Sequence, residues 1–329
     1  MKIIAIANGG FAVPTLQTLK ESHHSLSAVF AMPTRTNRVG KKAGISPVRE
    51  AVDGFLAGIP FFDPENINSP ESVALLKSFN ADIIFVCDYG KILSNDVLKT
   101  TTYGGLNLHG SILPKYRGAA PINRAIQNGE RELGVSVIFI EPKMDAGPIV
   151  AVSSYTPEIT DDAVAIEAKL AQMGAPLVLE ALDMIEKGKV VALPQDPNKV
   201  SKAPKIKKEE GRIDWNQSSS KIIDQYRAFQ PWPRVFSEWI CSDRSNEGIR
   251  VILGPFSELD ERGAAPVWSG DFYDSVEVGT ILETNKTSFW IKTGDGALRV
   301  LAVQPAGKNN MTSEVFIRGY RPKVGDMFR

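Results

Sequence analysis

Lys2-Ile-Ile-Ala-Ile-Ala7 is an apolar run of the kind found in strands that are buried on both faces. The turn Asn8-Gly9-Gly10 follows it, then a helical pattern over residues 11–22 and a second apolar run at residues 26–31. This strand–helix–strand order predicts the first βαβ unit of a parallel sheet. The glycines lack the Gly-x-Gly-x-x-Gly spacing, so the turn is interpreted as a place where a ligand can approach the backbone, without dinucleotide specificity.

The alternation of strands and helices continues through the first 150 residues. Strands are expected over residues 82–87, 105–108 and 135–140, and helices over residues 47–58, 69–80, 94–100 and 122–128. A long helical stretch follows at residues 161–187, with an interruption expected near Gly174-Ala-Pro176. The predicted fold class is therefore α/β, with a doubly wound, mostly parallel, Rossmann-like sheet that binds ligands at the carboxyl ends of its strands.

The second half of the chain has a different pattern. Residues 190–206 contain Pro194, Pro197 and Pro204 together with several lysines, which is typical of a linker. A helix is expected at residues 218–229, and short strand candidates follow at residues 235–240, 249–253, 279–282, 289–292 and 298–303. This spacing predicts a small OB-like β-barrel. We therefore expect a catalytic domain at residues 1–189, a linker at residues 190–206 and a β-barrel domain at residues 207–329.

The composition is that of a soluble globular chain. The 329 residues carry 38 basic and 38 acidic side chains, and 43% of them are hydrophobic. No apolar run reaches the roughly 18 residues that a membrane-spanning helix needs. The two cysteines, Cys87 and Cys241, fit a reducing cytoplasm. Of the three histidines, His23 and His24 are adjacent, which leaves no set of zinc ligands, so no metal is expected.

The residues with the clearest chemical potential lie in Gly105-Leu-Asn-Leu-His109 and Met144-Asp-Ala-Gly-Pro-Ile149. Asn107 and His109 are two positions apart, so at a strand end their side chains point to the same side. If Asp145 joins them, an amide, an imidazole and a carboxylate can bind an oxyanion and transfer a proton without a nucleophilic side chain. From spacing alone, a satisfied turn at Asn107 and His109 and an Asx turn at Asp145 remain the commoner interpretations.

The wider sequence context favours the catalytic interpretation. Gly105-Leu-Asn-Leu-His-Gly-Ser-Ile-Leu-Pro-Lys-Tyr-Arg-Gly-Ala-Ala-Pro121, together with Asp145-Ala-Gly147, resembles the signature of the 10-formyltetrahydrofolate-dependent formyltransferases. The likeness is greatest to the branch of that family that acts on methionyl-tRNA. Residues 207–215, 227–233 and 304–308 are similar to segments of this branch at the domain junction and in the barrel. Differences from the usual pattern include Val39 in the loop after the second strand, and Asp88 and Lys91 beside Tyr89-Gly90.

The resemblance implies a donor, an acceptor and a site. The donor is 10-formyltetrahydrofolate, and the acceptor is the α-amine of methionine esterified to initiator tRNA. Asn107 and a protonated His109 would stabilise the oxyanion, and Asp145 would favour that protonated form and accept a proton. The formyl-folate pocket would include Ser111, Ile112, Leu113, Pro114, Tyr89 and Gly90. The tRNA would be bound by Arg35, Arg38, Lys41, Lys42, Lys207 and Lys208. A monomer in the cytoplasm, with no metal and no membrane partner, is expected.

Three other functions remain open at this point, of which a folate-binding hydrolase domain is a weaker alternative, because such chains usually continue into other domains. A formyltransferase acting on an amino-sugar nucleotide would share the N-terminal motifs and the chemistry, although Gly40-Lys-Lys42 and the C-terminal segments favour tRNA. A non-catalytic module that binds folate or tRNA would not need Asn107, His109 and Asp145, which this chain retains. Basic clusters are often no more than solvated surface, so they do not establish nucleic-acid binding on their own.

Overall fold

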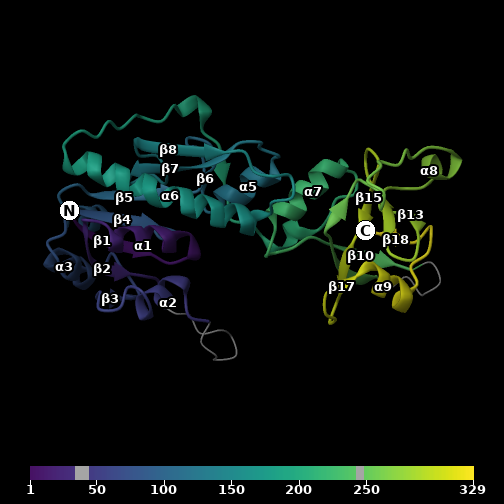
Figure 1. Cartoon of the computed structure of the whole chain (residues 1–329), viewed down its shortest axis with the longest axis horizontal. Helices are drawn as coiled ribbons and strands as arrows, with labels where there is room; N and C mark the ends of the chain where they lie inside the picture. The colour runs from purple at the N-terminus through teal and green to yellow at the C-terminus, as the bar shows by residue number, and fades with distance from the viewer. Residues whose placement is uncertain (34–43, 242–247) are drawn as a thin grey trace. The chain divides into compact units, whose positions relative to one another are not determined.

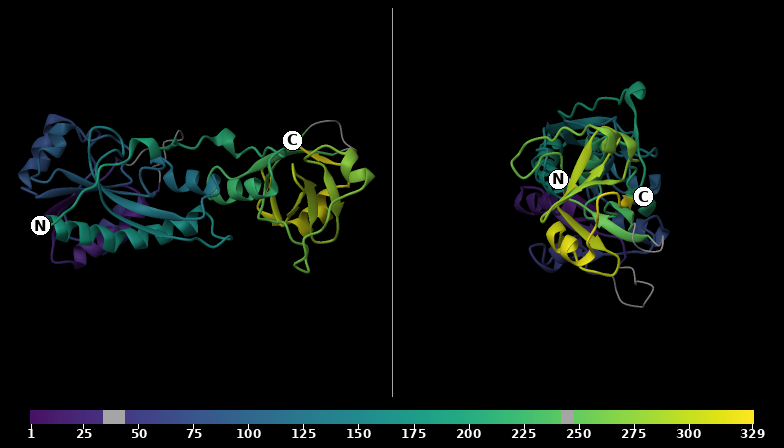
Figure 2. Two further views of the ribbon diagram at one scale, coloured as in Figure 1. Left: turned by 90° about the horizontal axis from the view of Figure 1, so that it is seen from above. Right: turned by 90° about the vertical axis from the view of Figure 1, so that its right-hand side faces the viewer.

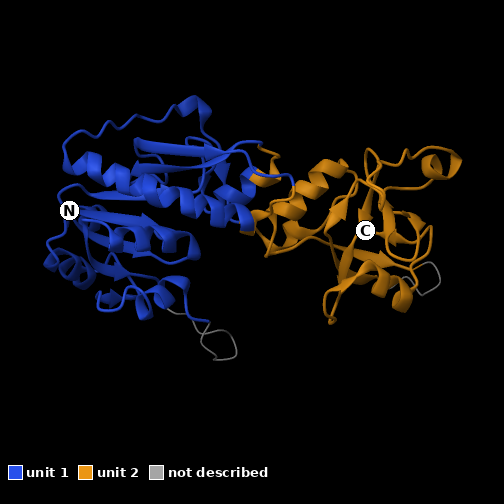
Figure 3. Cartoon of the chain, in the orientation of Figure 1, with its two compact units in different colours: residues 1–125, 131–159, 165–205 blue, residues 126–130, 160–164, 206–329 orange. Residues whose placement is uncertain are grey.

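The computed structural model describes residues 1–33, 44–241 and 248–329. Residues 1–125, 131–159 and 165–205 make a first compact unit, and residues 126–130, 160–164 and 206–329 make a second (Figure 3). The segment expected to be a linker belongs to the first unit up to residue 205. An antiparallel bridge joins its Leu193 to Ile149, and β9 (Lys202–Ala203) pairs with β6 (Arg117–Gly118). The prolines of this segment therefore interrupt regular structure without detaching the chain.

The first unit is built on a seven-stranded sheet with the order β3-β2-β1-β4-β5-β7-β8 (Figure 1). The strands are β1 (Lys2–Ala7), β2 (Ser25–Phe30), β3 (Phe61–Phe62), β4 (Ile83–Cys87), β5 (Gly105–His109), β7 (Leu133–Phe139) and β8 (Ile149–Tyr155). The pairs from β3 to β5 are parallel, whereas β7 pairs antiparallel with β5 and β8. This arrangement confirms the predicted mostly parallel, Rossmann-like sheet. The edge strand β8 was not predicted, because its half-exposed residues mix polar and apolar side chains without a buried run.

Helices cover both faces of this sheet. They are α1 (Val13–Glu21), α2 (Pro47–Asp53), α3 (Pro70–Ser78), α4 (Asn95–Leu98), α5 (Pro121–Gln127) and α6 (Ala163–Glu186). α1 and α6 lie on one face and α3 on the other (Figures 1 and 2). Ile4 and Ile6 of β1 belong to the core cluster that includes Leu76 of α3 and Val97 of α4. Ile3 on the opposite face is equally 0% exposed, so β1 needs apolar residues on both faces after Lys2.

Serine–proline pairs start two of these helices. The Ser46 hydroxyl accepts a hydrogen bond from the Arg49 N–H, and the Ser69 hydroxyl accepts one from the Ser72 N–H. A proline follows each serine at the first helical position, where its missing N–H has no helical partner to lose. α2 ends at Asp53 rather than at the expected residue 58, because Gly54 adopts a non-helical conformation.

The strand order reverses beside β1, and this position is important for the site. The chain passes from β1 outward to β2 and β3, and β4 then lies on the other side of β1. Ala7 at the end of β1 pairs in register with Cys87 at the end of β4. Because the connections from these two ends leave in opposite directions, a crevice opens between them, which is where open α/β sheets bind ligands.

α6 runs along the sheet as one continuous helix of 24 residues. The interruption expected near Gly174-Ala-Pro176 is wrong, because Pro176 lies inside the helix on its exposed side. The residue that matters is Gly174: a Cβ there would lie 2.6 Å from Cδ2 of Leu108. Glycine thus lets α6 approach β5 closely, and this packing outweighs the roughly 3 kcal/mol that a proline costs inside a helix. Neither α6 nor any other helix of the described residues is long and apolar enough to cross a membrane.

The second unit is an antiparallel β domain. Its five-stranded sheet has the order β17-β16-β11-β10-β18, and its four-stranded sheet has the order β12-β15-β14-β13. The strands are β10 (Phe236–Ile240), β11 (Ile249–Leu253), β12 (Phe256–Ser257), β13 (Ile281–Thr284), β14 (Phe289–Lys292), β15 (Ala297–Val300), β16 (Ala302–Pro305), β17 (Met311–Thr312) and β18 (Met327–Phe328), and the helices are α7 (Ser219–Ala228), α8 (Asp271–Ser275) and α9 (Ser313–Tyr320).

The two sheets of the second unit are continuous with one another. β15 passes into β16 at Leu301, so the single strand expected at residues 298–303 is two strands in different sheets. A bridge between Thr280 and Met327 joins the four-stranded sheet to the five-stranded one at another edge. Trp239, Phe289 and other aromatic side chains that are at most 1% exposed fill the space between the sheets. The unit therefore has the barrel-like construction predicted from its short strands.

Candidate active site

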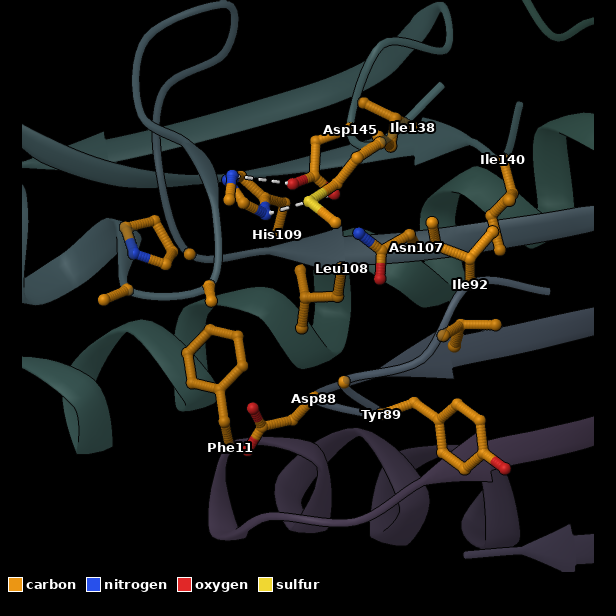
Figure 4. A pocket seen from close by; sticks show the side chains of 18 of the residues that line it. Phe11, Asp88, Tyr89, Ile92, Asn107, Leu108, His109, Ile138, Ile140 and Asp145 are labelled. Atoms are coloured by element: carbon orange, nitrogen blue, oxygen red, sulfur yellow. Dashed lines mark hydrogen bonds and ion pairs between the residues drawn. The ribbon is translucent and has the colours of Figure 1, made fainter. Parts of the chain in front are cut away.

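A cavity of about 360 Å³ opens at the carboxyl ends of β4 and β5 in the first unit. Its lining includes the three predicted catalytic residues, Asn107, His109 and Asp145, together with Tyr89 and Gly90 of the predicted folate set (Figure 4). These residues come from β5, from the loop after β7 and from the loop after β4. The sheet thus brings residues from three separate segments of the sequence together at one edge.

β5 aims Asn107 and His109 into the cavity. Asn107 pairs in register with Val86 of β4 and with Ile138 of β7, so its backbone is fixed on both sides. Leu108 between the two polar residues points the other way, against Gly174 of α6. In the described part of the chain, the Asn107 amide makes no side-chain hydrogen bond, and it reaches into the cavity (Figure 4). This amide is therefore available to a ligand.

The imidazole of His109 is held from one side. It is 6% exposed, and its Nε2 lies 3.0 Å from the carbonyl oxygen of Tyr116. Because a carbonyl only accepts hydrogen bonds, Nε2 carries a hydrogen and donates it. Nδ1 then faces Asp145, with 3.7 Å between Nδ1 and Oδ1. The Tyr116 backbone is fixed in turn, since its N–H donates to the Ser201 hydroxyl at 2.9 Å.

The carboxylate of Asp145 is also oriented by backbone. Its Oδ2 accepts a hydrogen bond of 2.8 Å from the N–H of Gly118. Asp145 itself has a φ of 50°, a left-handed conformation that aspartate tolerates better than most residues. The Gln195 amide donates to the carbonyl oxygens of Asp145 and Gly147 at 2.9 and 2.7 Å. Arg117 donates two hydrogen bonds to the Gln195 Oε1, of 3.0 and 2.7 Å, so the loop is tied to β6.

Gln195 and Gly118 are positioning residues that sequence reasoning missed. Gln195 lies in the proline-rich segment taken for a linker, and a lone glutamine there gives no signal for a contact 50 residues away. Gly118 has a φ of 132°, and a Cβ on it would lie 2.5 Å from the Ala203 carbonyl oxygen. The close pairing of β6 with β9 therefore requires glycine beside Asp145.

A second set of ionisable groups in the same cavity consists of Asp88 and Glu167. Asp88 follows β4 with a φ of 56°, and its Oδ2 lies so close to Gly9 that a Cβ there would be 1.7 Å away. Asp88 is exposed where it borders the cavity, and the protein atoms around its carboxyl group raise the pKa of that group. The pKa of Glu167 in α6 is raised too, first by burial and then by the charge of Asp88. Two carboxyl groups thus line one cavity, and the charge of Asp88 acts on Glu167.

Family models match both units. The model described as formyl transferase matches residues 1–182, and the one described as formyl transferase, C-terminal domain, matches residues 205–321. A methionyl-tRNA formyltransferase of Rhodopirellula baltica is 36% identical to this chain, over 99% of this chain and 96% of the relative. The chain belongs to the methionyl-tRNA formyltransferase family.

Solved structures of other proteins share the fold of this family member. The N-formyltransferase of Helicobacter canadensis, in complex with folinic acid and dTDP-3-aminofucose, has a TM-score of 0.63 at 18% identity and covers 93% of this chain and 99% of its own. HypX from Aquifex aeolicus in complex with tetrahydrofolic acid has a TM-score of 0.60 at 18% identity. The match covers 98% of this chain but only 48% of HypX, so the chain spans about half of that protein.

The predicted folate residues do not all meet at the cavity of this formyltransferase. Ser111, Ile112, Leu113 and Pro114 are not part of its lining. The Ser111 hydroxyl donates instead to the Lys115 carbonyl at 2.7 Å, and the Leu113 N–H donates to the Ser136 hydroxyl at 3.0 Å. Since Ser136 pairs with His109 in the sheet, the segment braces the strand end that carries the histidine.

The predicted tRNA residues fall into two groups. Arg35, Arg38, Lys41 and Lys42 lie outside the described residues. Lys207 and Lys208 are exposed at the start of the second unit, where the short helix η3 (Lys208–Gly211) begins. The Lys207 N–H donates to Oε1 of Glu210 at 2.7 Å, which fixes the backbone and leaves its ammonium group at the surface.

From the sequence, the adjacent pair His23 and His24 was not expected to bind a metal. In the structure this pair lies beside two carboxylates at the end of α6. Potential ligand atoms of His23, His24, Asp183 and Glu186 all lie within 4.8 Å of one another. The side chain of His24 is fully buried, with Nε2 3.1 Å from Oδ1 of Asp183. Burial is the main cause that lowers the pKa of His24, which favours the neutral form. The set could hold a divalent ion, and none of its members lines the catalytic cavity.

Proposed function

We propose that this family member transfers the formyl group of 10-formyltetrahydrofolate to the α-amine of methionyl initiator tRNA, giving N-formylmethionyl-tRNA. The observation that carries the proposal is the meeting of Asn107, His109 and Asp145 in one cavity, with the histidine and the carboxylate oriented by backbone and the amide free. The name of the full-length relative supports the choice of acceptor. The N-terminal family match and the folate-bound neighbours support the choice of donor.

In the proposed acyl transfer, Asn107, His109 and Asp145 each have a different role. The neutral amine attacks the formyl carbon, a C–N bond forms, and the carbonyl electron pair moves to oxygen. The Asn107 amide donates a hydrogen bond to this oxyanion, and the positive charge of the protonated His109 ring, held between the Tyr116 carbonyl and Asp145, stabilises it. Asp145 accepts the proton that the attacking amine loses, directly or through water. When the oxyanion collapses, the bond to N10 of the folate breaks and N10 takes up a proton.

The two units have separate roles in this proposal. Every residue that lines the catalytic cavity belongs to the first unit, so we assign folate binding and chemistry to it. The second unit, with Lys207 and Lys208 at its start, would hold the tRNA together with the basic residues Arg35, Arg38, Lys41 and Lys42. The first unit extends to residue 205, so a fragment ending there tests this division: it should bind folate like the full chain and tRNA much more weakly.

The function is tested by offering one donor and two acceptors to the purified full chain. 10-Formyltetrahydrofolate is combined with methionyl initiator tRNA or with an amino-sugar nucleotide, and formylated products are measured by mass spectrometry. We expect product only from the methionyl-tRNA, and a rate roughly 10²- to 10³-fold lower from an Asn107→Ala variant that retains the wild-type circular dichroism spectrum. Formylation of the sugar nucleotide alone would contradict the assignment and leave the reaction class intact.

A further inference from the structure

His23 and His24 lie at the edge of the sheet opposite the catalytic cavity. They belong to the turn between α1 and β2 and so precede the start of a parallel strand, whereas the cavity opens where the strands end. Ser22 fixes this turn. Its hydroxyl donates to the Leu19 carbonyl at 2.8 Å and accepts a hydrogen bond of 3.1 Å from the His24 N–H. The backbone that carries the two imidazoles is therefore held by the end of α1.

The last turn of α6 lies against this turn, beside the start of the chain (Figures 1 and 2). Asp183 and Glu186 are three residues apart on α6, so their carboxylates share one side of the helix. Nε2 of His23 lies 3.3 Å from Oδ1 of Asp183 and 3.4 Å from Oε2 of Glu186. Nε2 of His24 lies 3.1 Å from the same Oδ1. Nζ of Lys187 lies 3.9 Å from the other oxygen of Asp183, which leaves Oδ1 directed at the histidines.

The separations between these ligand atoms fit the corners of a tetrahedral zinc site. Zinc binds imidazole nitrogen and carboxylate oxygen at about 2.0–2.2 Å, so neighbouring ligand atoms around it are about 3.3–3.6 Å apart. The measured separations are 3.1, 3.3 and 3.4 Å, and all four ligand atoms lie within 4.8 Å of one another. Two carboxylates balance the charge of a divalent ion. The two imidazoles favour zinc over magnesium and calcium, which prefer oxygen ligands.

The second atoms of His24 and Glu186 are bound by the amino group of Met1. This group lies 3.0 Å from Nδ1 of His24 and donates to Oε1 of Glu186 at 2.7 Å, which leaves Nε2 and Oε2 for an ion. Burial first, and then the charges of the amino group and of His23, lower the pKa of His24 and favour its neutral form. Ion binding at Nε2 requires the tautomer with its hydrogen on Nδ1, which the neutral amino group accepts, so binding releases a proton.

We propose that His23, His24, Asp183 and Glu186 form a structural site for one zinc ion. The ion joins the turn before β2 to the end of α6, and 159 residues separate His24 from Asp183. A cross-link that closes so long a loop restricts the unfolded chain, so zinc binding stabilises the folded first unit. The site lies outside the cavity and has no part in formyl transfer. Among the described residues, no second group of histidine, cysteine and acidic side chains converges in this way.

The test measures what zinc does to the full chain and to variants that lack one ligand. The protein is freed of metal with a chelator and titrated with zinc chloride by calorimetry, and its Tm is measured with and without zinc. His23→Ala and Glu186→Gln remove ligands from exposed positions, and Glu180→Gln changes an exposed carboxylate elsewhere on α6 as the matched control. We expect one ion per chain and a Tm roughly 5–10 °C higher at a zinc concentration about 100-fold above the Kd. Each ligand variant should bind zinc at least about 100-fold more weakly, and the control should match the wild type.

Cobalt(II) in place of zinc reports the geometry of the site. Tetrahedral cobalt absorbs visible light much more strongly than octahedral cobalt, so the wild type should show the strong bands and His23→Ala should lose them. The change in Tm that zinc causes is compared within each protein, so an effect of a variant on the metal-free state cancels. No rise in Tm, a weak octahedral spectrum, or equal zinc affinity of the wild type and His23→Ala overturns the site. A lower kcat for formyl transfer in metal-free His23→Ala overturns the purely structural role. None of these outcomes depends on which acceptor the protein formylates.

Discussion

Two pairs of ionisable groups share one cavity and differ in how they are held. His109 and Asp145 are each tied to backbone, through the Tyr116 carbonyl and the Gly118 N–H. Asp88 and Glu167 have no such tie among the described residues, and their surroundings disfavour their charge. In the proposed mechanism the first pair acts in the transition state, and such a role requires the fixed geometry that these backbone contacts give. The second pair is exposed to the cavity and is not fixed by a hydrogen bond within the described residues.

The largest effect is expected at the rigid group. Replacing Asn107, His109 or Asp145 with Ala should lower kcat for formyl transfer by roughly 10²- to 10³-fold, since each loses a contact made in the transition state. Double replacements should cost less than the sum of the single ones, because the residues act as one unit. Single-turnover assays with saturating folate measure this, alongside circular dichroism. A His109→Ala enzyme with near-normal turnover would refute the mechanism.

Gln195→Ala tests whether rigidity itself matters. The change removes the hydrogen bonds to the carbonyls of Asp145 and Gly147 but leaves the bond between His109 and Tyr116. A carboxylate displaced by a fraction of an ångström should lower kcat by roughly 10- to 100-fold, with little change in the KM for folate. Gln172→Ala, at an exposed position of α6, is the control. If Gln195→Ala is as active as the control, the tie to β6 does not contribute to catalysis.

How much of the site the sequence predicts depends on how far apart in the sequence the contacting residues are. Strand periodicity, which is local, predicted that Asn107 and His109 point to the same side, and the motif predicted that Asp145 joins them; all three line one cavity. Gln195 was missed because its partners lie in another segment, and the hydrogen bond from the Ser111 hydroxyl to the Lys115 carbonyl is likewise not something that a motif predicts. The same holds for the fold. β1 and β5 follow from local apolar runs, whereas the continuity of α6 through Pro176 depends on packing against Leu108 that only the tertiary structure supplies.

Gly9→Ala should disturb Asp88 of the second pair by sterics alone. A Cβ at this position would lie 1.7 Å from Oδ2 of Asp88, and the end of a flexible side chain can move away at little cost. We expect a roughly two- to fivefold higher KM for the substrate that contacts this part of the cavity, folate or methionyl-tRNA, on the order of half the free energy of one hydrogen bond to a charged group, with unchanged kcat. Gly10→Ala is a close control, since the nearest atom to its Cβ would be 4.0 Å away. Identical kinetics for the two variants would separate the position of Asp88 from substrate binding.

The smallest effect concerns stability and has a defined sign. The folded state raises the pKa of Asp88, so between its unfolded value near 3.9 and the raised value the folded protein binds more protons than the unfolded one. Stability that the protonated carboxyl group contributes is therefore lost as the pH rises through the raised pKa. Asp88→Asn cannot ionise, so its Tm should exceed that of the wild type by about 1–2 °C at neutral pH, and the difference should vanish near pH 4. Glu167→Gln should also raise the Tm at neutral pH. The increase should be smaller in the Asp88→Asn background, because the charge of Asp88 is one of the two causes that raise the pKa of Glu167.

Both effects are measured by thermal unfolding of the wild type, the two single variants and the double variant across this pH range. A variant that is less stable than the wild type at neutral pH would mean that Asp88 has a stabilising partner in the folded chain, and the contrast between the two pairs would then fail.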